Sequence, residues 1–169
     1  MRKFLYIFLS VVLFVNCSTK EEEKCSNTGV PPARFIFVIK KDISKAQDFL
    51  STNNQIDNSV HFYRIDRNTK ETLETSYSET SESGDYISIR LNNINTISTG
   101  TLQTFYLNNK GTPIEIQVKI NTEHTECEGN MHRVNELIID GEKRNANFLL
   151  EWSPFINYEN KELPSNLSY

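Results

Sequence analysis

Residues 114–120 read Ile-Glu-Ile-Gln-Val-Lys-Ile, the cleanest apolar–polar alternation in the chain. Successive side chains of a β-strand point to opposite faces, so this pattern predicts a strand with its aliphatic residues on a core and its polar residues in water. A turn-forming run, Asn-Asn-Lys-Gly-Thr-Pro at 108–113, separates it from another strand pattern at Leu102–Leu107. Turn residues between two strand patterns are typical of a β-hairpin.

Further short strand patterns lie on both sides of this hairpin. We expect them at Ala33–Lys40, Val60–Ile65, Thr72–Tyr77, Tyr86–Leu91, Val134–Ile139 and Asn147–Trp152. The first is apolar on both faces, which is typical of a covered, central strand. Thr72–Tyr77 is weakly patterned and is expected at an edge. Ser44 and Gln47 have the spacing of a capping box, which predicts a short helical turn over residues 45–50. The polar residues Glu123–Met131 are expected to form a loop.

Seven to eight short strands with turn signals between them indicate an all-β protein that folds as a single β-sandwich. The expected type is immunoglobulin-like or transthyretin-like. The sandwich is expected to span residues 33–153, and the polar residues 154–169 to form a tail that frays. No Gly-rich phosphate loop is present, and no cofactor is expected.

The amino terminus predicts export. Arg2 and Lys3 precede an apolar run from Phe4 to Val15. That run is shorter than the roughly 20 residues that a membrane-spanning helix needs, so it is typical of a secretory signal peptide. The segment Leu13-Phe14-Val15-Asn16-Cys17 resembles the lipobox of bacterial lipoproteins. The resemblance implies removal of residues 1–16 and attachment of lipid, including palmitate-type acyl chains, to Cys17. The alternatives are an ordinary signal peptide with a coincidental cysteine and an uncleaved anchor.

Residues 17–32 are expected to form an acidic tether between the lipid and the sandwich. Ser18 does not resemble the residue that retains lipoproteins at the inner membrane, which implies an outer-membrane location. The cluster Lys20-Glu21-Glu22-Glu23 resembles the export tag of surface lipoproteins of Bacteroidetes, which implies exposure on the cell surface. The alternative interpretation is a solvated charged linker.

The net charge argues against one class of partner, and the cysteines suggest a disulfide. Loss of residues 1–16 from the 169-residue chain leaves 16 basic against 22 acidic residues, a net charge of −6. Such a protein is poorly suited to nucleic acid. With Cys17 carrying lipid, Cys25 and Cys127 are candidates for a disulfide, which an oxidising compartment permits. Free thiols, or an intermolecular bridge from Cys25, are the alternatives.

Candidate chemistry is sparse. His124, Cys127 and His132 have a spacing that zinc can use, but the expected loop and the competing disulfide favour no metal site. No G-x-S-x-G motif of a serine hydrolase occurs. His61 lies in an apolar strand and is expected to be a packing residue. Asp57 and Asp66 are a weak candidate pair for glycoside hydrolysis.

Across the domain the chain resembles small uncharacterised lipoproteins of Bacteroidetes. The resemblance rests on a cysteine before a Pro-rich start, the pattern F-x-F-x-I at Phe35–Ile39, and the late Cys127 before a final hairpin. That family carries no assigned activity.

We therefore expect a non-enzymatic, lipid-anchored binding or accessory protein that contacts a protein or glycan. Its aromatic contacts would come from Tyr77, Tyr86 and Tyr106, unless these tyrosines cover the core at sheet edges. The alternatives are a structural subunit of a surface assembly and a hydrolase of envelope polymers.

Overall fold

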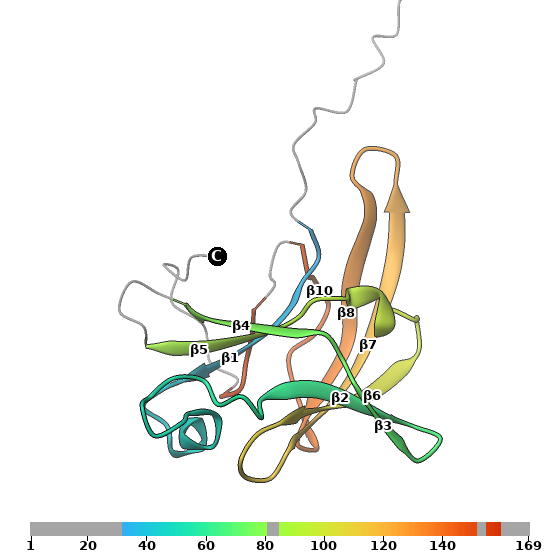
Figure 1. Cartoon of the computed structure of the whole chain (residues 1–169). Helices are drawn as coiled ribbons and strands as arrows, with labels where there is room; N and C mark the ends of the chain where they lie inside the picture. Colours follow the sequence, from blue (N-terminus) through green and yellow to red (C-terminus); the bar gives the residue numbers. More distant parts are fainter. Residues whose placement is uncertain (1–31, 81–84, 152–154, 160–169) are drawn as a thin grey trace, which may run out of the picture.

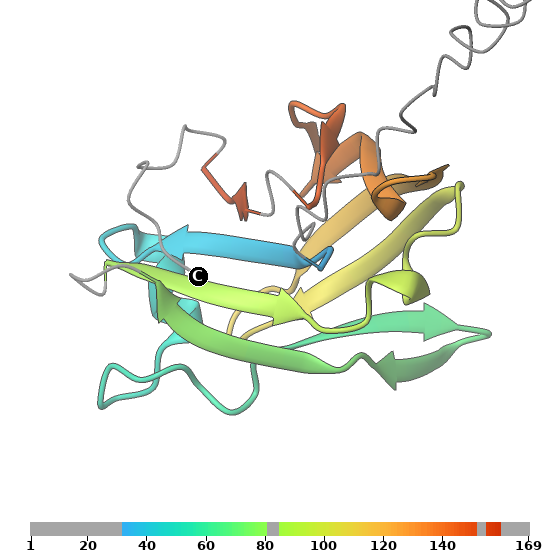
Figure 2. The same ribbon diagram turned by 90° about the horizontal axis from the view of Figure 1, so that it is seen from above.

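The computed structural model describes residues 32–80, 85–151 and 155–159, and within them it is almost entirely β-structure in two packed sheets. The all-β sandwich is confirmed. The smaller sheet has the strand order β11-β1-β5-β4, and the larger has β10-β8-β7-β6-β2-β3, with β9 paired to β8 (Figure 1). Seen from above, β1, β5 and β4 form a layer that faces the strands of the larger sheet (Figure 2).

The strands of the smaller sheet are β1 (Phe35–Lys40), β4 (Thr75–Thr80), β5 (Tyr86–Leu91) and β11 (Phe155–Asn157). The strands of the larger sheet are β2 (His61–Asp66), β3 (Thr69–Thr72), β6 (Leu102–Asn108), β7 (Ile114–Thr125), β8 (Gly129–Ile139), β9 (Glu142–Lys143) and β10 (Phe148–Leu149). Two short 3₁₀ helices are η1 (Ser44–Phe49) and η2 (Ile94–Thr96).

Strand β1 is central, as its apolar sequence predicts. It pairs antiparallel with β5 and parallel with β11, and Phe35 through Ile39 are all fully buried. Phe35, Phe37 and Ile39 belong to the hydrophobic core between the sheets. The predicted inward residues of β7 also lie in that core, because Ile114, Ile116, Val118 and Ile120 have no exposed surface.

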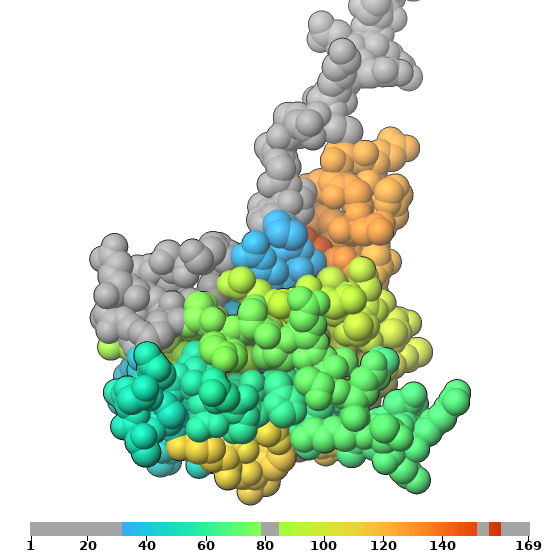
Figure 3. Space-filling model, viewed as in Figure 1, coloured from blue at the N-terminus to red at the C-terminus, as the bar shows by residue number. Residues whose placement is uncertain are grey.

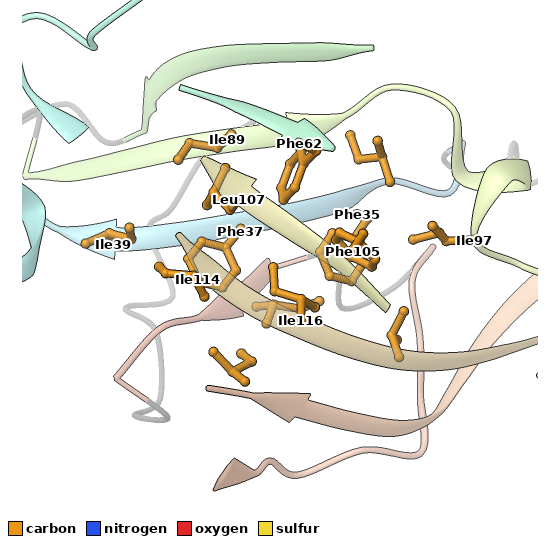
Figure 4. Close-up of a cluster of buried hydrophobic side chains, with 14 of the residues drawn as sticks. Phe35, Phe37, Ile39, Phe62, Ile89, Ile97, Phe105, Leu107, Ile114 and Ile116 are labelled. Carbon is orange, nitrogen blue, oxygen red and sulfur yellow. The ribbon is translucent and has the colours of Figure 1, made fainter. Parts of the chain in front are cut away.

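Three phenylalanine rings join the sheets at the centre of the core (Figure 4). Phe35 of the smaller sheet contacts Phe62 and Phe105 of the larger one in edge-to-face geometry, with ring centroids 6.2 and 5.2 Å apart. Phe62 and Phe105 meet each other at 5.7 Å. Edge-to-face packing suits the ring quadrupole, so the triad contributes more than the area it buries.

The hairpin of β7 and β8 is longer than the sequence predicts. The expected loop Glu123–Met131 is wrong, because Asn121 through Thr125 pair with Arg133 through Gly129 and leave only residues 126–128 in the turn. The far half of this hairpin extends beyond the body of the sandwich (Figure 1, Figure 3). Its side chains are mostly exposed, so it lacks the alternation that burial imposes on a strand.

The predicted strand Thr72–Tyr77 is two strands in different sheets. β3 ends at Thr72 and β4 begins at Thr75, and the chain crosses between the sheets at the buried Leu73. The Leu73 N–H donates to the Phe62 carbonyl at 2.8 Å, which fixes the crossing point. The expectation of an edge position is correct for both pieces, since each ends the order of its sheet.

The helical turn at residues 45–50 is present as η1, but the capping box is wrong. The N-cap is Ile43, and no side chain caps it. Lys45 instead pairs with Asp48 at 3.0 Å and donates to the Thr112 carbonyl at 3.1 Å. The turn is therefore held by the Lys45–Asp48 ion pair and by contacts with the β6–β7 connection, not by a capping box.

The carboxyl-terminal part also differs from expectation. The predicted strand Asn147–Trp152 shortens to β10, followed by the buried Leu150, and Trp152 lies outside the described residues. Phe155–Asn157 was expected in the tail but forms β11, and Ile156 is buried in the core. The sandwich thus continues past residue 153, where the sequence placed its end.

Several predictions fall on residues outside the described ranges. These are the signal peptide 1–16, the lipid site Cys17, most of the tether 17–32, Cys25, and the last ten residues of the tail. The finer assignment to an immunoglobulin-like or transthyretin-like type also stays a prediction. Among the described residues, no helix is long and apolar enough to cross a bilayer.

Candidate binding surface

An aromatic row lies on the outward face of the larger sheet. Val60 and Phe62 point into the core, so the alternation of β2 turns His61, Tyr63 and Ile65 outward. The register places Tyr63 opposite Tyr106 of β6. We call His61, Tyr63 and Tyr106 the aromatic row.

The rings of the aromatic row contact one another. Tyr63 and Tyr106 stack with centroids 5.2 Å apart and an interplanar angle of 20°. His61 lies beside Tyr63 with centroids 6.1 Å apart and tilted by 52°. The ammonium of Lys70, on β3, lies 3.8 Å from the centroid of Tyr63, close enough for a cation–π interaction. The row is therefore pre-arranged by its own contacts.

A charged side chain lies at each end of the stacked tyrosine pair. Lys70 lies over Tyr63 at one end, and Glu115 of β7 lies opposite Tyr106 at the other. Burial raises the pKa of the Tyr106 phenol, and the negative charge of Glu115 raises that pKa further. The raised pKa keeps the Tyr106 phenol protonated to a more alkaline pH than an ordinary tyrosine. Glu115 also accepts a hydrogen bond from the Gln117 amide at 2.7 Å.

Exposed aliphatic surface borders the aromatic row. Ile65 continues the outward face of β2 and is 57% exposed, and Leu102 at the start of β6 is 45% exposed. The β2–β3 hairpin that carries Ile65 and Lys70 projects from the body of the molecule (Figure 1, Figure 3). Exposed apolar groups next to stacked aromatic rings are typical of an interaction surface.

The structure separates the three tyrosines named from the sequence. Tyr106 is half-buried in the aromatic row on the larger sheet. Tyr77 is 45% exposed on the edge strand β4, and Tyr86 is half-buried at the start of β5, both in the smaller sheet. Only Tyr106 therefore lies in the candidate surface.

The alternation of residues 60–65 puts His61, Tyr63 and Ile65 on one face of a strand, but it does not mark Tyr63 as a contact residue. The signal for that role was the pairing of Tyr63 with a tyrosine 43 residues later. This pairing can be recognised only when the register of β2 against β6 is known.

The candidate metal ligands His124, Cys127 and His132 do not form a metal site. Among the described residues, no group of three or more His, Cys, Asp or Glu side chains could hold a metal ion. His124 Nδ1 contacts the Asn130 amide at 3.0 Å, and His132 Nδ1 contacts Ser98 at 2.9 Å. Cys127 lies in the three-residue turn of the β7–β8 hairpin. Its pairing with Cys25 stays a prediction, because Cys25 lies outside the described residues.

His132 is the centre of a separate polar cluster. Its Nδ1 contacts the hydroxyls of Ser98 and Thr122, at 2.9 and 3.3 Å, and those hydroxyls contact each other at 2.9 Å. The buried Glu151 accepts the backbone N–H of His132 at 2.6 Å. A catalytic triad needs its acid on the imidazole ring, whereas this contact is to the main chain. The cluster instead ties the η2–β6 connection and residue 151 to the long hairpin.

The candidate catalytic carboxylates Asp57 and Asp66 lie toward opposite ends of one strand. Asp57 precedes β2 and Asp66 is its last residue, so the six-residue strand separates them by about 20 Å. Glycoside hydrolysis needs carboxyl groups about 5 to 10 Å apart. Asp57 instead accepts the N–H and the hydroxyl of Ser59 at 2.9 and 2.7 Å, and these hydrogen bonds lower its pKa.

Comparison with known proteins finds no relative of this chain. No protein-family model, no curated protein and no solved structure matches the chain. The functional argument therefore rests on the surface itself.

Proposed function

We propose that the protein is a non-enzymatic binding or accessory module, held at the outer membrane by lipid on Cys17 and exposed to a protein or glycan. The observation that supports binding is the stacked pair Tyr63 and Tyr106 with the exposed Ile65 beside it. Rings that are already held in place lose little conformational freedom when a partner covers them. The location rests on the sequence of residues 1–24.

Site-specific photocrosslinking in intact cells tests the contact surface. A benzophenone side chain replaces Ile65 beside the aromatic row, and a matched one replaces Ser78, which is exposed on the other sheet. We expect a discrete product from position 65 that weakens several-fold in the Tyr63→Ala background. Equal labelling from both positions, or no effect of Tyr63→Ala, would contradict the proposed surface.

A second candidate, a structural subunit that assembles by strand addition, is favoured by strand β4. It ends the smaller sheet, Glu79 is the one charged residue in its sequence TSYSET, and Tyr77 is exposed. Edge strands usually carry charges that prevent pairing with other chains. The other edge, β3, has such charges in Lys70 and in Glu71, which pairs with Arg64 at 2.6 Å. Strand addition therefore fits β4 better than β3.

Ser78→Lys tests the second candidate. A lysine on the edge should block strand addition and dissolve any large assembly, which sedimentation of solubilised membranes would detect. Lys70→Ser on β3 is the control and should leave the assembly intact. Assembly that survives Ser78→Lys would rule out this use of β4.

We further propose that Cys25 and Cys127 form a disulfide, which would fix the tether to the turn of the β7–β8 hairpin. Closing a loop of about 100 residues stabilises a folded chain by up to about 4.7 kcal/mol in the chain-entropy model. Peptide mapping without reductant should recover the two cysteines in one cross-linked peptide. Their recovery as separate alkylated thiols would contradict the bridge.

A further inference from the structure

Strands β2 and β6 separate just beyond the aromatic row. Their ladder ends where Tyr63 lies opposite Tyr106. The same register would place Ile65 opposite Thr104, but these two residues do not pair. Figure 2 shows the two strands diverging beyond this point. We call the diverging segments, residues 64–66 of β2 and residues 102–105 of β6, the fork.

The fork leaves backbone groups of β6 without a strand partner. The Leu73 N–H donates to the Phe62 carbonyl, so even-numbered residues of β2 bond to β3, and Tyr63 turns its backbone groups toward β6. Backbone groups alternate along β6 in the same way, so those of Thr104 and Leu102 point toward β2. The opposite edge of β6 is paired with β7 as far as Leu102. Among the described residues, no strand pairs with the open edge at these two positions.

Apolar side chains are exposed on both arms of the fork. Ile65 of β2 is 57% exposed, and Leu102 of β6 is 45% exposed. Within the described part of the chain, Tyr77 is the one other large apolar side chain that is exposed. An open strand edge beside exposed apolar groups suits recognition by strand addition, in which backbone pairing gives affinity and alternate side chains give specificity.

A lysine lies beside each of these apolar side chains. The register places Lys70 opposite Ile65 and Lys119 opposite Leu102. In the described ranges neither ammonium makes an ion pair, although Glu136 lies opposite Lys119 in the register of β8. Carboxylates of a partner would complement these two positive charges.

We propose that the fork binds an extended polypeptide segment. The segment pairs with the open edge of β6 at Leu102 and Thr104, and it carries an aliphatic side chain between acidic ones. A glycan has no alternating N–H and C=O groups with which to form such a ladder. The inference rests on the proposed function, because it names the partner class of the same surface. It uses an edge inside the larger sheet, not the edge strand β4.

Selection from a phage-displayed library of linear peptides tests the partner class, and an array of neutral and acidic oligosaccharides is the alternative probe. The bait is the full chain purified in detergent. We expect selected peptides in which Asp or Glu flanks an aliphatic residue. They should bind at least about tenfold more weakly to Thr104→Pro, because proline removes a backbone N–H from the open edge.

Thr72→Pro is the matched control. It removes an N–H from the outer edge of β3, which lies outside the fork, and it should leave peptide binding unchanged. Equal peptide binding by Thr104→Pro and the unaltered protein would overturn the inference. Selection of basic peptides, or of no peptide at all, would overturn it as well.

A measurement on the peptide keeps the test decisive if Thr104→Pro fails to fold. Methylating the backbone nitrogens of a selected peptide one at a time should weaken binding at alternate positions, because every second N–H of the bound peptide faces β6. Insensitivity at every position would contradict backbone pairing.

The outcomes also separate this inference from the proposed function. Oligosaccharide binding that Tyr63→Ala abolishes and Thr104→Pro leaves intact would overturn the inference and keep the proposed surface. A fork that binds peptides, while position 65 yields no crosslinked product in cells, would instead contradict the proposed function.

Discussion

Phe105 is the aromatic residue on which the contact between the sheets most depends, because it packs edge-to-face on both Phe35 and Phe62. All three rings are 0 to 1% exposed. Removing one ring would leave a cavity that the two sheets cannot close without shifting relative to each other.

We predict that Phe105→Ala lowers the free energy of unfolding by about 3–5 kcal/mol, since the cavity adds to the lost burial. Equilibrium denaturation in urea measures the loss. Leu102→Ala, at an exposed position of the same strand, should change stability by less than about 0.5 kcal/mol. Similar values for both variants would contradict the central role of the triad.

Tyr106 makes stability depend on pH in the alkaline range. Its pKa lies above the ordinary value of 10.0, chiefly through burial and then through Glu115. The unfolded chain therefore loses this proton first, so the contribution is complete below pH 10 and declines as pH rises through the folded-state pKa. Tyr106→Phe should reduce the fall in unfolding free energy between pH 9 and 11. An unchanged slope in urea titrations across that range would refute the assignment.

The β2–β3 hairpin shows how the turn determines the shape of an element. Arg67 and Asn68 both have positive φ, at 47° and 65°, as the two central residues of a type I′ turn require. Arginine is poorly suited to this conformation, whereas Asp140-Gly141 in the β8–β9 turn is well suited to it.

We predict that Arg67→Asn with Asn68→Gly raises the free energy of unfolding by about 0.5–1 kcal/mol, because the new pair prefers this turn. Thermal and urea denaturation measure the change. The reverse change at the second turn, Gly141→Arg, should destabilise, since Gly141 has φ of 78°. A loss of stability in the Asn-Gly variant would mean that contacts of Arg67 stabilise the fold by more than its positive φ costs.

Elements with a buried face were predictable from the sequence, and the others were not. The core strands β1, β5, β6 and β7 carry alternating or continuous apolar residues, because the core imposes that pattern. Most side chains in the far half of the β7–β8 hairpin are exposed, and only the neighbouring Met131 and His132 are buried, so no alternation marks this half in the sequence. β11 has a single core residue, Ile156, which is too little signal in three residues.

The candidate surface could be predicted from the sequence only in part, for a related reason. Alternation places Tyr63 and Ile65 on one face of β2. It does not show that β6 lies beside β2, nor that Tyr106 falls opposite Tyr63. That information depends on strand order, which short-range patterns do not carry.

At the scale of the whole molecule, the proposed membrane attachment has the clearest test. We predict that Cys17→Ser moves the protein from the membrane fraction to the soluble fraction and abolishes labelling by palmitate, because a multiply acylated cysteine anchors almost permanently. Ser18→Ala, next to the lipid site, should leave both unchanged. Membrane retention of the Cys17→Ser protein without label would instead indicate an uncleaved apolar leader.

The central place of β1 has a mechanical consequence. A pull applied at Pro32 along the axis of β1 acts on a strand that is hydrogen-bonded on both sides, to β5 and to β11. Those bonds run across the direction of pull, so they resist in shear and must yield together, whereas an edge strand peeled sideways would release them one at a time. A domain suspended from this end would therefore withstand drag from a bound partner or from flow.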